Sequence, residues 1–89
     1  MSLDHQLAAL VDLAESLGIT IRRAPVMGGG EHPGGALVRL KGSEMLFLDP
    51  TAAIAEQIEA AASALRGRPQ LADRFLPPEI REALEKDRD

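Results

Sequence analysis

The chain has 89 residues, enough for one domain, 1–89, with a thin hydrophobic core. Fourteen acidic and ten basic residues give a net charge of −4, which disfavours nucleic acid as a partner because a phosphate backbone requires a basic surface. The absence of cysteine excludes disulfides, thiolate nucleophiles and cysteine-ligated zinc. Since no apolar run is long enough for a membrane span and the N-terminus lacks a signal pattern, we expect a soluble cytoplasmic protein with no membrane contact.

The first third of the chain predicts a helix, a strand and a loop. Leucines recur at helical spacing from about Leu3 to Leu17, and Gly18 is suited to end that helix. The β-branched residues of Ile19–Arg23 then predict a short strand. Five glycines and a proline lie between Val26 and Gly35, so we expect a mobile loop there.

Two strands, Ala36–Lys41 and Glu44–Asp49, flank Gly42-Ser43. Glycine at the first position of a two-residue loop indicates a type II′ hairpin, which would pair Leu40 with Met45. The alternation then divides the side chains between two faces, both apolar. One face, the expected core, carries Ala36, Val38, Leu40, Met45 and Phe47, and the other carries Leu37, Leu46 and Leu48 beside Arg39, Lys41 and Glu44.

The rest of the chain predicts two more helices. Asp49 is suited to cap the first of them, with Pro50 at its first position and an end near Arg66. A last helix over 78–87 follows Pro77-Pro78 and is predicted to dock on the body of the domain, as an appendage, through residues such as Ile80.

These elements predict an α+β fold in the order α-β-β-β-α-α. We expect a small three-stranded antiparallel sheet with its helices on one face. No helix is then left for the second face, and Leu37, Leu46 and Leu48 would be exposed on it. An exposed apolar sheet face is typical of an interface, so we expect self-association as a homodimer, or docking on another protein, through these leucines or an edge strand.

Two arginines and a histidine are the candidate ligand-binding residues. If the strands are neighbours, Arg22 and Arg39 form a small anion-binding patch, with His32 supplied by the glycine-rich loop. The competing interpretation, which we favour, is that these arginines pair with Glu44 or with acids of a second subunit. The loop itself lacks the helix that follows the glycines in a phosphate-binding motif.

Metal and catalytic sites are not predicted. The histidines, His5 and His32, have no evident third ligand, and Glu56 and Glu59 fit a solvated helix face. The serines form no group with histidine and aspartate that would suggest a nucleophile. We therefore expect no metal or other cofactor, and we favour a non-enzymatic protein.

Three segments carry a resemblance to a family of small bacterial proteins of unassigned activity. They are Gly34-Gly35-Ala36-Leu37-Val38-Arg39-Leu40-Lys41-Gly42, then Leu46-Phe47-Leu48-Asp49, then Phe75-Leu76-Pro77-Pro78-Glu79-Ile80-Arg81-Glu82. The resemblance spans most of the chain and implies a bacterial source, but it implies no activity.

The order of elements is also similar to the minimal core of zinc-dependent peptidases of the phage-immunity regulator type. In those enzymes the helix after the hairpin carries His-Glu-x-x-His. The matching stretch here is Ala55-Glu56-Gln57-Ile58-Glu59, which keeps the glutamate and lacks both histidines. The resemblance implies at most a degenerate relative without zinc chemistry.

Two functions follow from these observations. The preferred one is a non-enzymatic cytoplasmic interaction module, acting as a homodimer or as a small subunit of another protein. The alternative is a protein, or a minor enzyme, that binds a small anionic ligand through Arg22, Arg39 and the glycine-rich loop.

Overall fold

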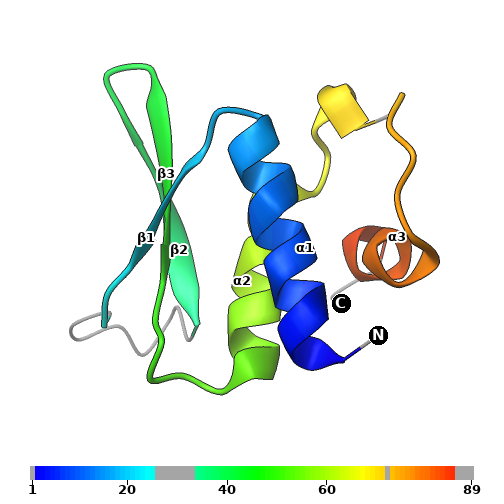
Figure 1. Cartoon of the computed structure of the whole chain (residues 1–89). Coiled ribbons are helices and arrows are strands. Elements are labelled where there is room, and N and C mark those ends of the chain that lie inside the picture. The colour runs from blue at the N-terminus through cyan, green and yellow to red at the C-terminus, as the bar shows by residue number, and fades with distance from the viewer. Residues whose placement is uncertain (1, 26–33, 72, 86–89) are drawn as a thin grey trace.

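The computed structural model describes residues 2–25, 34–71 and 73–85 and has the predicted α+β class (Figure 1). Its elements, in chain order, are α1 (Leu3–Ser16), β1 (Thr20–Arg23), β2 (Gly35–Leu40), β3 (Ser43–Leu48), α2 (Ile54–Leu65), the 3₁₀ helix η1 (Pro69–Leu71) and α3 (Pro78–Glu85). The sequence did not predict η1. In the described part of the chain, no helix has both the length and the apolar character needed to cross a membrane.

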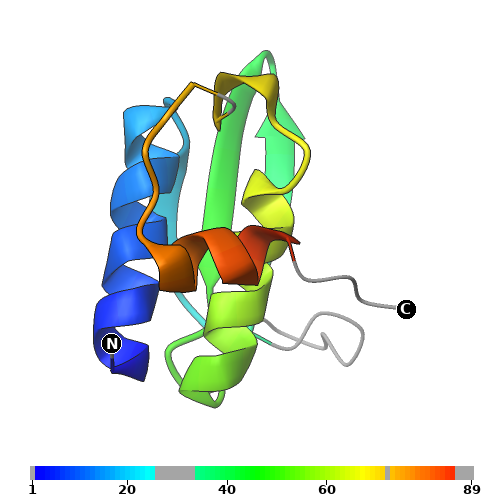
Figure 2. The same ribbon diagram turned by 90° about the vertical axis from the view of Figure 1, so that its right-hand side faces the viewer.

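The helices and the sheet form layers. Helices α1 and α2 lie side by side against one face of the sheet, and α3 packs on the far side of this helix pair (Figure 1). Figure 2 shows α3 running across the other two helices. Ile80 of α3 is buried and belongs to the same hydrophobic core as Leu10 of α1 and Leu65 of α2. The predicted docking of this last helix on the body is therefore present.

The sheet is mixed, so the expectation of an antiparallel sheet is only partly right. Its strand order is β1-β3-β2, with β2 antiparallel to β3 and β1 parallel to β3. The connection between β1 and β2 runs from Ala24 to Gly34. A connection of that length carries the chain past the neighbouring position, so β3 rather than β2 lies in the centre.

The hairpin turn is centred one residue earlier than predicted. Lys41 and Gly42 both have positive φ, 53° and 81°, as a type I′ turn requires. Leu40 therefore pairs with Ser43 and Val38 with Met45, in place of the predicted type II′ register. Moving the centre of the turn by one residue changes each cross-strand partner by two residues, so Leu40 pairs with Ser43 rather than with Met45. Because side chains alternate along a strand, such a shift leaves the composition of each face unchanged.

The helices cover the face that we expected to be open. Leu46 and Leu48 are fully buried in the core, and Leu37 packs against it. On the opposite face, Val38 and Leu40 are 39% and 63% exposed. The alternation correctly separates the two faces but does not say which one the helices cover. The apolar side chains that this face supplies from β2 and β3 are all leucines, Leu37, Leu46 and Leu48, which fill the space beneath two helices well.

Helix α2 begins later than predicted. The Asp49 carboxylate accepts hydrogen bonds from the Thr51 backbone N–H at 2.9 Å and from the Thr51 hydroxyl at 2.6 Å, so it stabilises a turn before the helix. Ala53 occupies the N-cap position and makes no side-chain cap. The predicted cap by Asp49 is therefore wrong. The predicted stop is close to the observed one, because Gly67 with φ of 78° follows the last turn.

Two glycines at the end of the predicted loop are tightly packed. The Gly34 carbonyl accepts a hydrogen bond from the Asp49 N–H at 2.9 Å, and both Gly34 and Gly35 are buried. A Cβ on Gly34 would collide with the backbone carbonyl of Glu56 in the first turn of α2. These positions therefore bring the start of β2 against α2. The remainder of the predicted loop, 26–33, lies outside the described residues.

Candidate functional site: the open face of the sheet

The sheet face turned away from the helices is the candidate site, and we call it the open face. No other described segment lies over it (Figure 1). The register places eight described side chains on this face: Thr20, Arg22, Ala36, Val38, Leu40, Ser43, Met45 and Phe47.

The centre of the open face is apolar. Val38 pairs with Met45, and Ala36 pairs with Phe47, so four apolar side chains of β2 and β3 lie next to one another. Leu40 extends this patch toward the hairpin turn and is 63% exposed. Val38 is also exposed, whereas Ala36, Met45 and Phe47 are half-buried. A partly exposed apolar cluster on a sheet face is typical of a protein contact surface.

The charge on the open face has one sign. Arg22 pairs in register with Phe47 and is exposed, and no described carboxylate pairs with its guanidinium. Lys41 adds a second cation in the turn at one end. The eight described residues of this face include no acid. A partner with carboxylates beside its apolar residues would therefore be complementary to it.

The open face is narrow. Three strands spaced about 4.8 Å apart and six residues of about 3.3 Å give a surface of ~14 by ~20 Å. Any partner that contacts this face alone, whether a second copy or a helix, would bury at most roughly 600 Å² in total, about half of the lower limit for a stable interface, so we expect a weak contact. A single α-helix is about 10 Å wide and covers ~20 Å with about 14 residues, so its dimensions match the face.

The predicted anion-binding patch is not assembled. Arg22 lies on the open face and Arg39 lies on the helix-covered face, and they stand on the two edge strands with β3 between them. The favoured alternative is confirmed for Arg39, whose Nε donates to Glu44 Oε2 at 3.0 Å. The third predicted member, His32, lies outside the described residues.

Glu44 binds a second arginine, which sequence reasoning missed. Arg68 follows α2 and donates from both terminal nitrogens to the Glu44 carboxylate, at 2.8 and 2.7 Å, while its Nε donates to the Ala64 carbonyl at 2.7 Å. Hydrogen bonds from Arg68 and then Arg39 lower the pKa of Glu44 from 4.5 to about 2. The same carboxylate raises the pKa of Arg68. All three guanidinium nitrogens of Arg68 already donate to acceptors of the protein, so we assign this cluster a structural role rather than ligand binding.

The predicted interface leucines do not form an exposed surface. Leu46 and Leu48 are covered by helices of their own chain, and Leu37 packs against the same core. They contribute to stability. The side chains of the same two strands that face away from the helices are Val38, Leu40, Met45 and Phe47, and these are the interface candidates.

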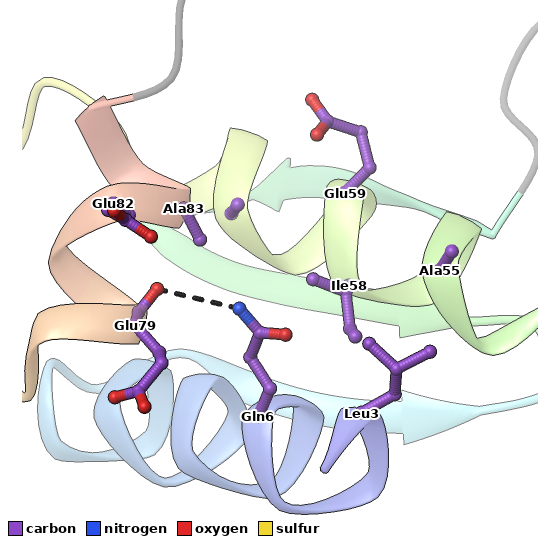
Figure 3. A pocket seen from close by; sticks show the side chains of 9 residues that line it. Leu3, Gln6, Ala55, Ile58, Glu59, Glu79, Glu82 and Ala83 are labelled. Carbon is purple, nitrogen blue, oxygen red and sulfur yellow. Dashed lines mark hydrogen bonds between the residues drawn. The ribbon is translucent and has the colours of Figure 1, made fainter. Parts of the chain in front are cut away.

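A groove between α1, α2 and α3 carries the residues that correspond to the zinc-peptidase motif. It has a volume of about 290 Å³, and Ala55 and Glu59, at the two histidine positions, both line it. In Figure 3, Glu79 lies on the opposite side of the groove from Glu59, and the Glu59 carboxylate points away from it. Glu59 is bound by Arg66 at 2.8 Å. Among the residues that the structure describes, no three potential ligands gather into a metal site.

Comparisons of the chain with protein-family models, with curated proteins and with solved structures found no match.

Proposed function

We propose that this protein is a non-enzymatic interaction module, a small subunit whose open face binds an acidic amphipathic helix of another protein. The observation that carries the proposal is the exposure of an apolar sheet face, with Leu40 63% exposed, although the chain has three helices available. All three lie on the other side of the sheet (Figure 1).

The charge of the open face favours a separate partner over a second copy, because a second copy would present the same cations and no described acid to Arg22 and Lys41. A helix of about 14 residues matches the face in length. The partner would place an aliphatic stripe over Val38, Met45 and Phe47. Its carboxylates would lie beside Arg22 and Lys41, where the face offers cations and no described acid.

The test uses a defined probe. An alanine-based helical peptide of about 14 residues carries leucines at i, i+3, i+4 and i+7, with glutamates on both sides of that stripe. A matched peptide replaces the glutamates by lysines. Binding is followed by amide chemical shifts of the ¹⁵N-labelled protein. We expect the glutamate peptide to bind at least tenfold more tightly than the lysine peptide and to shift β2 and β3 most strongly.

Two variants distinguish specific binding at the open face from nonspecific binding to any exposed apolar residue. The Val38→Glu/Leu40→Glu double variant should bind the glutamate peptide at least tenfold more weakly. Phe75→Glu is the matched control, because Phe75 is 86% exposed and lies in the connection before α3. Circular dichroism should show that both variants are folded. Equal loss in both, or binding that maps to the helices, would contradict the proposal.

Sedimentation equilibrium distinguishes a second copy from a separate partner. We expect a monomer at micromolar concentration. A dimer that the Val38→Glu/Leu40→Glu variant converts to monomer would show that the open face binds its own copy and would overturn the proposed partner.

A further inference from the structure

A second candidate site lies on the opposite side of the molecule. It is a cavity of about 290 Å³ between the end of α2, η1 with the chain that follows it, and α3. Figure 2 shows this connection arching from η1 toward α3 on the helical side, away from the sheet. The cavity therefore shares no residue with the open face.

Leucines form the apolar part of this cavity. Leu65 is fully buried, and three further leucines, half-buried, come from η1, from the connection and from α3. In chain order the four are Leu65, Leu71, Leu76 and Leu84. Such a lining favours the alkyl part of a ligand, because contact with it removes apolar surface from water.

Four arginines and one glutamate supply the charge. Arg66 and Arg68 line the cavity, but each is already bound to an acid outside it, Glu59 and Glu44 respectively. Their guanidinium groups are therefore largely satisfied. Arg66 joins α2 to α3 through Glu59 and the Ala83 carbonyl, and Arg68 joins the end of α2 to β3 through Glu44, so the net charge of the cavity is left to the remaining residues.

Arg74 and Arg81 are the guanidinium groups free to meet a ligand. Arg74 donates one hydrogen bond, from Nη1 to the Ser16 hydroxyl at 2.8 Å, and no described carboxylate pairs with Arg74 or Arg81. Among the described lining residues, Glu85 is the acid and opposes them. In that described part of the lining, two cations against one acid leave an excess positive charge next to an apolar cavity. A guanidinium group binds a carboxylate through parallel N–H donors.

The Arg66 side chain contributes a further polar feature. Its Nε is buried and has no hydrogen-bond partner, although both terminal nitrogens are bound to Glu59 and one also donates to the Ala83 carbonyl at 2.9 Å. A buried donor without an acceptor is costly. Because Nε has almost no accessible surface, a molecule in the cavity would not reach it, and Arg66 contributes to the wall of the cavity rather than to ligand binding.

We infer that this cavity binds a medium-chain alkyl carboxylate. At about 30 Å³ per heavy atom, the volume of a water molecule in the liquid, the cavity holds about ten heavy atoms. A straight-chain acid of eight carbons has that size. Its alkyl chain would contact the three half-buried leucines, Leu71, Leu76 and Leu84, and its carboxylate would lie between Arg74 and Arg81. The inference is independent of the proposed function.

The probes are octanoate, octanol and acetate, which separate the alkyl chain from the charge. Binding is measured by calorimetry and by the methyl resonances of the ¹³C-labelled leucines. We expect octanoate to bind and to shift Leu71, Leu76 and Leu84, with octanol and acetate at least tenfold weaker. The Arg74→Gln/Arg81→Gln variant should weaken octanoate binding at least tenfold, and Glu85→Gln should strengthen it.

Arg23→Gln is the control, since it removes an exposed guanidinium of β1 that lies outside both the cavity and the open face, and it should leave octanoate binding unchanged. Octanol binding as tightly as octanoate would overturn the role of the arginines. Acetate binding as tightly would overturn the role of the leucines. Octanoate that shifts β2 and β3 instead, or that shifts no leucine at millimolar concentration, would overturn the site itself.

Discussion

Arg68 and Glu44 form a bidentate ion pair. It joins the chain just after α2 to the start of β3, next to the hairpin turn. Arg68 Nη1 lies 2.8 Å from Glu44 Oε1, and Nη2 lies 2.7 Å from Oε2. The two residues are 24 positions apart in the sequence. Arg39 donates to the same carboxylate across the β2–β3 pair. One carboxylate thus holds the hairpin against the end of the helix layer.

The two arginines of this cluster should differ in their contribution to stability. The Arg68 side chain is 14% exposed and also binds the Ala64 carbonyl, whereas that of Arg39 is 74% exposed and binds Glu44 through a single donor. We expect Arg68→Gln to lower the Tm clearly and Arg39→Gln to lower it little, because exposed pairs contribute little. Thermal unfolding followed by circular dichroism measures both. Equal Tm values for the two variants would contradict the assignment of Arg68 as the main partner.

Glu44 should make the stability depend on pH in the acidic range. The arginine partners lower its pKa in the folded state to about 2, below the ordinary value of 4.5. A lowered folded-state pKa means that the stabilisation is fully present above about 4.5 and is lost as the pH falls through about 2. Urea unfolding of the wild type at several pH values in this range measures the loss. The Glu44→Gln variant, which has no carboxylate here, should show a smaller decrease.

The sequence was sufficient for the three α-helices and the three strands, but not for η1, and it was sufficient for the division of the hairpin into two faces. Both come from local periodicity, which needs no knowledge of tertiary contacts. It was insufficient for the choice of the covered face, since Leu37, Leu46 and Leu48 on one side and Val38, Leu40 and Phe47 on the other are comparably apolar. That choice depends on how the helices pack on the sheet, which local periodicity does not encode.

The candidate site was placed on the wrong face of the sheet, because the sequence did not show which face the helices cover. The sequence predicted an exposed apolar sheet face but assigned it to the wrong leucines. The Arg22–Arg39 patch was predicted on the condition that their strands are neighbours. That condition is not met, because β3 lies between β1 and β2, and the sequence does not reveal the strand order. The Arg68–Glu44 pair had one available signal, a lone acid on an otherwise basic and apolar hairpin, which requires a cation to face it.

The choice of covered face can be tested by truncating one leucine on each side of the sheet. Leu46 is fully buried, so Leu46→Ala should decrease the free energy of unfolding by about 2–5 kcal/mol. Leu40 is 63% exposed, so Leu40→Ala should change it by less than about 0.5 kcal/mol. Urea unfolding of the two variants provides the comparison. A larger effect at Leu40 than at Leu46 would mean that the helices cover the other face.

Gly34 and Gly42 should respond differently to the same substitution, although both have positive φ, 90° and 81°. At Gly42, in the hairpin turn, an added Cβ meets no described atom, so Gly42→Ala should cost only the left-handed backbone strain of about 1–2 kcal/mol. At Gly34 the added Cβ would also collide with the backbone of Glu56 and Gln57. Because backbone atoms cannot move aside as a flexible side chain does, we expect Gly34→Ala to cost about 3 kcal/mol or more.

Urea unfolding of Gly34→Ala and Gly42→Ala measures this difference, and hydrogen exchange locates it. The collision at Gly34 should push the start of β2 away from α2. It should therefore increase the exchange of the Asp49 amide, which donates to the Gly34 carbonyl. In Gly42→Ala that amide should stay protected, since the turn lies at the other end of the strand. Similar costs for both variants, with Asp49 protected in each, would show that Gly34 is chosen for its φ alone and that β2 does not approach α2 as closely as the structure indicates.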